Sequence, residues 1–195
     1  MIYFDNNATT ALAPEAEEAM AAAARLGGNA SSVHSAGREA RRLLNEAREG
    51  VAALLKAPES NLTFTSGGTE SINAAMLGVF LPVLGPRHLI VTSVEHSAVL
   101  KTADFLEGLG VAVTRLGVDV EGRLDLAELE AAIRPETKLI AAMFANNETG
   151  NLFPVKRIGE LARAKGIPYL CDAVQAVGRL EIDLSLLPID LLTAS

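Results

Sequence analysis

The sequence predicts an α/β fold in which one mostly parallel β-sheet is sandwiched by helices. From Asn61 to Ser195, short runs of β-branched and other apolar residues alternate with longer segments of helical composition. Such alternation is typical of parallel strands joined by crossover helices. Of the 195 residues, 49% are hydrophobic, so the chain can bury a substantial core.

Two helices are expected before the sheet. Segments 14–26 and 37–56 are rich in Ala, Glu and Arg, which favour helices. The second segment also has apolar residues at helical spacing. They form one stripe: Ala40, Leu43, Leu44, Ala47, Val51 and Leu54.

The remaining elements alternate along the chain. Strands are expected at 61–65, 88–93, 111–116, 138–144, 167–172 and 189–194, and helices at 70–81, 97–110, 126–133 and 156–165. Ligands of such sheets bind beyond the carboxyl ends of the strands. We therefore expect the functional groups in the loops TSGGTES, TSVEHSAV, ANNETGNLFP and DAVQAVG.

Composition excludes several classes of function. The net charge of −7 and the pI near 5.0 argue against a nucleic-acid surface. No apolar run approaches the roughly 18 residues of a membrane span, and the N-terminus does not resemble a secretory signal. One cysteine and three histidines without metal-binding spacing make a metal site unexpected. We expect a cytoplasmic protein with a small-molecule ligand.

The single cysteine, Cys171, stands beside an acid, Asp172. Side chains alternate along a strand, so the thiol and the carboxylate should face opposite sides of the sheet. A free cysteine inside an apolar strand usually behaves as a small buried hydrophobe. We therefore expect Cys171 to be structural and Asp172, at the end of its strand, to face the functional rim.

The loop TSGGTES could hold a phosphate. It places two glycines at the start of an expected helix, where free backbone N–H groups and the positive end of the helix dipole attract anions. The alternative is an ordinary helix start capped by a serine. No lysine follows the glycines as it does in a nucleotide-binding P-loop.

Pyridoxal phosphate would satisfy both the expected phosphate site and the acid at the end of its strand. Its pyridinium nitrogen would pair with Asp172, although an ordinary salt bridge would also account for that acid. His96 could stack on the ring and move protons, or could be a capping or surface group. Asn147 and Gln175 could donate to a ring oxygen, or serve only as turn residues.

The sequence resembles the pyridoxal phosphate-dependent cysteine desulfurases, the NifS/IscS-like group within the class-V aminotransferase branch of fold type I. The similarity extends over essentially the whole chain. It rests on the motifs YFDNNATT, GNASSVHSAGREAR, FTSGGTES, VTSVEHSAVL, ANNETGNLFP and YLCDAVQAVG, in family order and spacing. The form of EHSAVL and NNETG resembles the group that supplies sulfur for iron–sulfur clusters and tRNA thiolation.

The resemblance implies roles for particular residues. Gly68 and Thr69 would hold the phosphate, joined by Ser195. His96 would stack on the ring and act in catalysis, while Asn147 would lie near the ring oxygen and the substrate. The remaining cofactor-binding residues would be Asp172, at the ring nitrogen, and Gln175, at the ring oxygen.

The resemblance also implies a domain organisation. Residues 1–13 would form an N-terminal arm and 14–195 an incomplete cofactor-binding large domain, without the family's C-terminal small domain. The family's Schiff-base lysine would follow Ser195 by three residues, and its sulfur-accepting loop cysteine lies further on. We therefore expect these 195 residues to be inactive alone.

In the full-length enzyme, the resemblance implies a homodimer that acts on L-cysteine. The products would be L-alanine and an enzyme persulfide, which passes its sulfur to an acceptor or iron–sulfur scaffold protein. Two alternatives stay open. One is a class-V aminotransferase or selenocysteine lyase on the same scaffold; the other is a non-catalytic module for cofactor binding or dimerisation.

Overall fold

The computed structural model of the protein describes residues 2–82 and 84–195. The chain forms two compact units, Met1–Thr63 and Phe64–Ser195. The expected N-terminal arm, residues 1–13, lies within the first unit. In the described part of the chain, no helix is long and apolar enough to cross a membrane.

The first unit contains α1 (Pro14–Ala24), α2 (Ser35–Leu55) and the short 3-10 helix η1 (Glu59–Asn61). Pro14 begins α1, a position where its missing N–H costs nothing. The N-cap of α2 is His34, whose Nδ1 accepts a hydrogen bond from the backbone of Gly37 at 3.3 Å. Lys56 ends α2 with a left-handed backbone, φ 51°.

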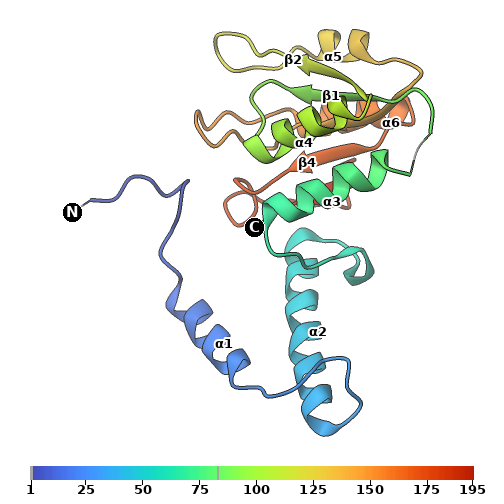
Figure 1. Ribbon diagram of the computed structural model, residues 1–195. Coiled ribbons are helices and arrows are strands. Elements are labelled where there is room, and N and C mark those ends of the chain that lie inside the picture. Colours follow the sequence, from blue (N-terminus) through green and yellow to red (C-terminus); the bar gives the residue numbers. More distant parts are fainter. Residues whose placement is uncertain (1, 83) are drawn as a thin grey trace. The chain divides into compact units, whose positions relative to one another are not determined.

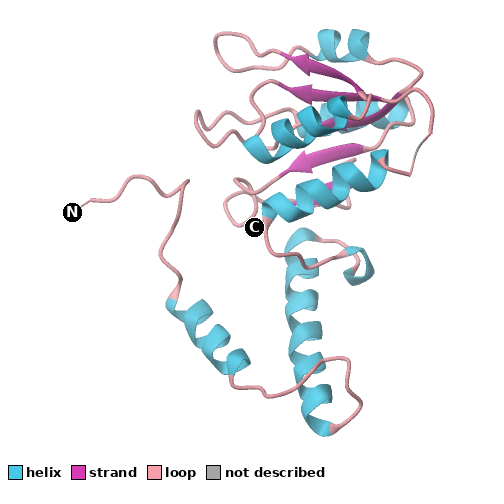
Figure 2. Ribbon diagram, in the orientation of Figure 1, coloured by secondary structure: helices cyan, strands magenta, loops and turns pink. Residues whose placement is uncertain are grey.

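The second unit contains a five-stranded sheet in the order β2-β1-β3-β4-β5 (Figures 1 and 2). All four neighbouring pairs are parallel, which confirms the predicted sheet. The strands are β1 (His88–Thr92), β2 (Ala112–Leu116), β3 (Thr137–Ala141), β4 (Tyr169–Asp172) and β5 (Leu191–Thr193).

Helices cover both faces of this sheet. Its four helices are α3 (Gly68–Phe80), α4 (Ser97–Gly108), α5 (Leu126–Ala132) and α6 (Val155–Ala164). Residues of α3 and α4 share one hydrophobic cluster with Leu170 of β4, whereas residues of α5 and α6 share another with Tyr169 and Cys171. The side chains of β4 therefore alternate between two cores, as the period of a strand requires.

The strand predicted at 61–65 is wrong. Glu59–Asn61 forms a 3-10 turn, and the next residues form neither strand nor helix. Leu62 does have an extended backbone, with φ −99° and ψ 127°. Within the described residues no neighbouring strand pairs with it, and a strand needs such a partner for its backbone N–H and C=O groups.

Candidate functional site

The predicted loops meet at the carboxyl edge of the sheet in the second unit. The strand order has a topological switch point between β1 and β3, because β2 lies on one side of β1 whereas β3 and the later strands lie on the other. The loops that follow such a pair diverge and leave a crevice where ligands bind in open α/β sheets. His96 follows β1 and Asn147 follows β3, so both lie at this switch point.

Asp172 is the last residue of β4, beside the switch point. Its side chain is buried, and one carboxylate oxygen accepts a hydrogen bond from the backbone of Val174 at 3.1 Å. Burial raises the pKa of Asp172 above its usual range, while that hydrogen bond and the charge of His96 lower it. Among residues 2–82 and 84–195, no Lys or Arg forms an ion pair with this carboxylate.

The prediction for Cys171 is confirmed. Its side chain is fully buried in the core on the α5 and α6 side. Burial raises the pKa of the thiol to about 12. A neutral, inaccessible thiol is a poor nucleophile, so Cys171 contributes packing rather than chemistry.

The start of α3 has the features of an anion site. Its N-cap is Gly67, with φ 153° and no side-chain cap, so the alternative of a serine-capped helix is wrong. A residue with a side chain rarely adopts this φ. The carboxylate of Glu70 instead accepts a hydrogen bond from the backbone of Ser66 at 2.5 Å. The amides of the first helical turn, starting with Gly68 and Thr69, are left for another acceptor.

Three loops converge at Gly68. A Cβ atom added there would lie 2.9 Å from Cγ2 of Val174 and 3.7 Å from Cβ of Ser195. The structure therefore brings the start of α3, the loop after β4 and the end of the chain after β5 side by side. Glycine at this position permits the close approach, since any larger residue would push Val174 away.

His96 is the N-cap of α4 and is exposed. Its Nδ1 accepts a hydrogen bond from the backbone of Ala98 at 3.2 Å. The capping interpretation is therefore confirmed, but it leaves Nε2 and the ring face free for other contacts. A neutral His96 that accepts at Nδ1 has its proton on Nε2.

The two predicted amides occupy the loops that follow the neighbouring strands β3 and β4. Nδ2 of Asn147 donates to Glu148 at 2.7 Å, and Oε1 of Gln175 accepts from Arg179 at 2.5 Å. Both side chains are half-buried at the rim. These local bonds orient the two amides within their loops.

Glu95 and Asn146, which were not predicted from the sequence, connect the loops of His96 and Asn147. Oε1 of Glu95 accepts hydrogen bonds from Oγ1 of Thr92 at 2.6 Å and from the backbone of Met143 at 2.9 Å. Nδ2 of Asn146 donates to the backbone oxygen of Val94 at 3.0 Å. The signal in the sequence was an acid and an amide next to apolar strand ends.

Asn146 also shapes its own loop. Its Oδ1 accepts from the backbones of Glu148 and Thr149, both at 2.9 Å, and so closes a turn around Asn147. The side chain of Asn146 is buried. Buried amides with several bonds to the backbone fix loop geometry, so Asn146 holds Asn147 at the rim.

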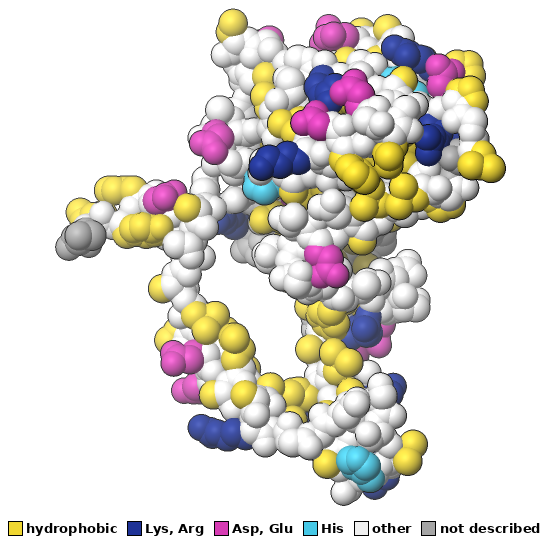
Figure 3. Space-filling model, viewed as in Figure 1, with side chains coloured by type: hydrophobic (Ala, Val, Ile, Leu, Met, Phe, Trp, Pro, Cys, Tyr) yellow, Lys and Arg dark blue, Asp and Glu magenta, His cyan; other side chains and the backbone are white. Residues whose placement is uncertain are grey.

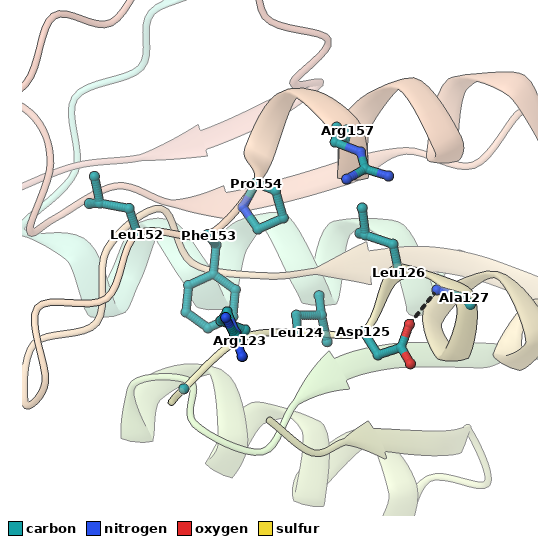
Figure 4. A pocket seen from close by; sticks show the side chains of 10 residues that line it. Arg123, Leu124, Asp125, Leu126, Ala127, Leu152, Phe153, Pro154 and Arg157 are labelled. Carbon is teal, nitrogen blue, oxygen red and sulfur yellow. Dashed lines mark hydrogen bonds between the residues drawn. The ribbon is translucent and has the colours of Figure 1, made fainter. Parts of the chain in front are cut away.

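A separate cavity of about 560 Å³ lies on the α5 and α6 side of the sheet (Figure 4). Apolar side chains that include Leu126, Phe153 and Pro154 line it, together with Arg123 and Arg157. None of the predicted site residues lines this cavity. It is therefore distinct from the rim that contains Asp172.

The rim therefore combines two complementary charges. A glycine-lined helix start favours an anion, and the buried carboxyl group of Asp172 favours a cation, because an unpaired carboxylate in this position is costly. Thr193, the register partner of Asp172 in β5, has a buried hydroxyl oxygen without a partner among the described residues. A polar molecule with a cationic ring and an anionic tail fits these features.

Comparisons with known proteins agree with this geometry. The sequence model of the class-V aminotransferases matches residues 2–195. A cysteine desulfurase of Trichormus azollae is 46% identical over 196 aligned residues, and cysteine desulfurase IscS of Methanosarcina thermophila is 45% identical. Each alignment covers 100% of this chain but only 49% and 48% of the relative, so the chain spans about half the length of these proteins.

Solved structures give the same result. The protein SspA in complex with cysteine superposes with a TM-score of 0.97 at 37% sequence identity. The superposition covers 100% of this chain and 57% of the SspA chain. The type I fold expected from the sequence is therefore confirmed.

Proposed function

Because the chain belongs to the class-V aminotransferase family, we propose that it forms the cofactor-binding part of a cysteine desulfurase. The substrate is L-cysteine, the products are L-alanine and a persulfide, and the cofactor is pyridoxal 5'-phosphate. The relatives named cysteine desulfurase support the activity. The complex of SspA with cysteine supports the substrate.

The observation that supports this proposal most is the environment of Asp172. It is a buried carboxyl group without a cationic partner among the described residues, at the same sheet edge as the helix start at Gly68. When bound, pyridoxal phosphate supplies an electron sink for the amino acid that it activates. Its charge distribution matches the two ends of this site.

The residues of this chain would divide the work as follows. Gly68, Thr69 and Ser195 would hold the phosphate at the start of α3. Asp172 would form a charge-assisted hydrogen bond to the ring nitrogen, worth about 1.5–3 kcal/mol, and would keep that nitrogen protonated. A cation at this position would in turn lower the pKa of Asp172.

Three further residues would act at the ring and the substrate. His96 would lie against the ring face, with Nε2 available to hold or transfer a proton. Asn147 and Gln175 would donate hydrogen bonds to the ring oxygen. None of these roles requires the thiol of Cys171.

The test is to measure cofactor binding and turnover with the full-length protein, because residues 1–195 alone are expected to be inactive. We expect pyridoxal phosphate to bind with a change in absorption, and L-cysteine to yield alanine and protein-bound sulfane sulfur in equal amounts. Inorganic phosphate should compete for the cofactor site. Absence of saturable cofactor binding would contradict the proposal, and turnover of selenocysteine but not cysteine would favour a lyase.

We also propose a homodimer, a protein that accepts the persulfide sulfur, and a cytoplasmic location. The first unit exposes several large apolar side chains, which supports a protein interface. The name of the IscS relative from Methanosarcina thermophila supports a role in iron–sulfur cluster assembly. The free thiol of Cys171 is compatible with a reducing compartment.

A further inference from the structure

The acid that precedes His96 has an unusual environment. Glu95 lies in the loop between β1 and α4, yet only 6% of its surface is exposed. Its Oε1 accepts two hydrogen bonds, whereas its Oε2 is buried without a partner among the described residues. A buried oxygen of this kind calls for an explanation, because desolvating an ionised carboxylate is expensive.

The contacts of Glu95 connect two strands. Thr92 is the last residue of β1, and Met143 follows the end of β3 by two residues. The two bonds to Oε1 therefore join the strand ends on both sides of the switch point. His96 follows Glu95 directly, so this connection also determines where α4 begins and where the imidazole lies.

The groups around Glu95 disfavour a negative charge. Asp172, Cys171 and Tyr169 of β4 all interact with it electrostatically, and no cation is among them. Burial raises the pKa of Glu95 to about 8, and the charge of Asp172 adds to this, although the bonds from Thr92 and Met143 favour the ionised form. Two neighbouring carboxyl groups in such a site do not both ionise readily.

On the basis of the function proposed above, we propose that Glu95 is a positioning residue that acts in its uncharged form. It ties the end of β1 to the end of β3, holds His96 at the rim, and leaves Asp172 as the single anion available to the cofactor nitrogen. In this form Oε2 bears the proton. The arrangement separates two nearby carboxyl groups by role: one is neutral and structural, the other is charged and binds the ring.

The charge of Glu95 can be tested without the cofactor. In the full-length protein, the infrared C=O stretch of a protonated carboxylic acid should be present at pH 6 and should diminish as the pH passes about 8. Glu95→Gln should remove this band. The matched control Glu160→Gln, at an exposed position of α6, should leave it unchanged. A band that Glu95→Gln does not affect would overturn the proposal.

Stability against pH gives a second readout of the same charge. The folded pKa lies above the ordinary value of 4.5, so the folded state retains a proton that the unfolded state loses. Stability contributed by this group is therefore fully present below about pH 4.5 and is lost as the pH rises to about 8. Between about pH 4.5 and 8, this group should make the unfolding equilibrium constant of the wild type rise by up to about tenfold per pH unit. Glu95→Gln should lack this contribution.

The positioning role is tested by cofactor binding. Glu95→Gln keeps the acceptor at Oε1, so its dissociation constant for pyridoxal phosphate should stay within about threefold of the wild type. Glu95→Ala removes both bonds and should weaken binding by about tenfold or more. Equal weakening by the two variants would overturn the proposal.

The two proposals fail in different ways. If the wild type does not bind pyridoxal phosphate, the desulfurase proposal fails and the role of Glu95 at the cofactor fails with it. If the cofactor binds but Glu95 is ionised at pH 6, only the inference about Glu95 is wrong. Should Glu95→Ala not fold, the infrared and pH comparison of the wild type with Glu95→Gln still decides the outcome.

Discussion

The two units of the chain differ in how they bury apolar residues. Within the described part of the first unit, only Gly37, Ala52 and Leu55 are buried. The second unit has two hydrophobic clusters, one on each face of its sheet. Exposed apolar side chains are visible along the N-terminal segment and α1 (Figure 3), where they include Ile2, Tyr3, Phe4, Leu12 and Met20.

We infer from this difference that the second unit serves folding and chemistry, whereas the first unit serves association. The second unit has its own core and all the candidate site residues, from Gly68 to Ser195. The first unit has a surface typical of a protein interface. We therefore expect substitutions in the second unit to affect folding and chemistry, and those at exposed positions of the first unit to affect association.

The largest expected difference concerns thiol reactivity. Because the pKa of Cys171 is about 12 rather than 9.0, the thiolate fraction near neutral pH should be roughly a thousandfold lower than in an ordinary cysteine. A cysteine introduced by Ala24→Cys, at an exposed position of α1, should react at once with a thiol reagent. Labelling of Cys171 should require denaturant. Rapid labelling of both thiols in the folded protein would contradict this view.

Core substitutions should show the next largest contrast. Phe80, at the end of α3, is fully buried, so Phe80→Ala should lower the free energy of unfolding by about 3–5 kcal/mol. Met20 in α1 is 62% exposed, and Met20→Ala should change the free energy of unfolding by less than about 0.5 kcal/mol. Denaturant unfolding of both variants measures the difference. A large effect of Met20→Ala would show that α1 is covered in the assembled protein.

Replacement of the buried acid should affect binding more than folding. Asp172→Asn keeps the shape but loses the charge, so cofactor affinity should fall by about 1.5–3 kcal/mol, which is roughly 10- to 150-fold. Glu18→Gln, at an exposed position of α1, should leave affinity unchanged. Titration with pyridoxal phosphate, followed by absorption, distinguishes the two variants. Unaltered affinity of Asp172→Asn would contradict the assigned role.

Substitutions of two glycines should give the smallest effects. Gly68→Ala would bring a methyl group to 2.9 Å from Val174, and should cost about 1–3 kcal/mol and weaken phosphate binding. Gly50 lies within α2, and a Cβ there would meet no atom within 4 Å. Gly50→Ala should therefore stabilise the protein by about 0.5–1 kcal/mol. Unfolding and phosphate titrations test both, and equal effects would show that Gly68 is not closely packed.

Local pattern predicted most of the second unit correctly. All five strands of the sheet and its four helices lie where apolar runs and helical composition indicated. The failure at 61–65 has a physical reason, since pattern reports preference for extended backbone but not the presence of a pairing strand. The stripe expected on α2 is also only partly buried, because Leu44 and Leu54 remain 41% and 56% exposed.

The sequence by itself determined the opposite orientations of Cys171 and Asp172, because the alternation of side chains in a strand is a local property. It also placed His96 and Asn147 directly after strands, whereas the tertiary structure decided that these two strands are neighbours in the sheet. Only the tertiary structure decided that Gly68, Val174 and Ser195 meet, and that Glu95 joins the end of β1 to the loop after β3. Such contacts depend on the order of the strands and on burial, which arise only when distant segments pack together.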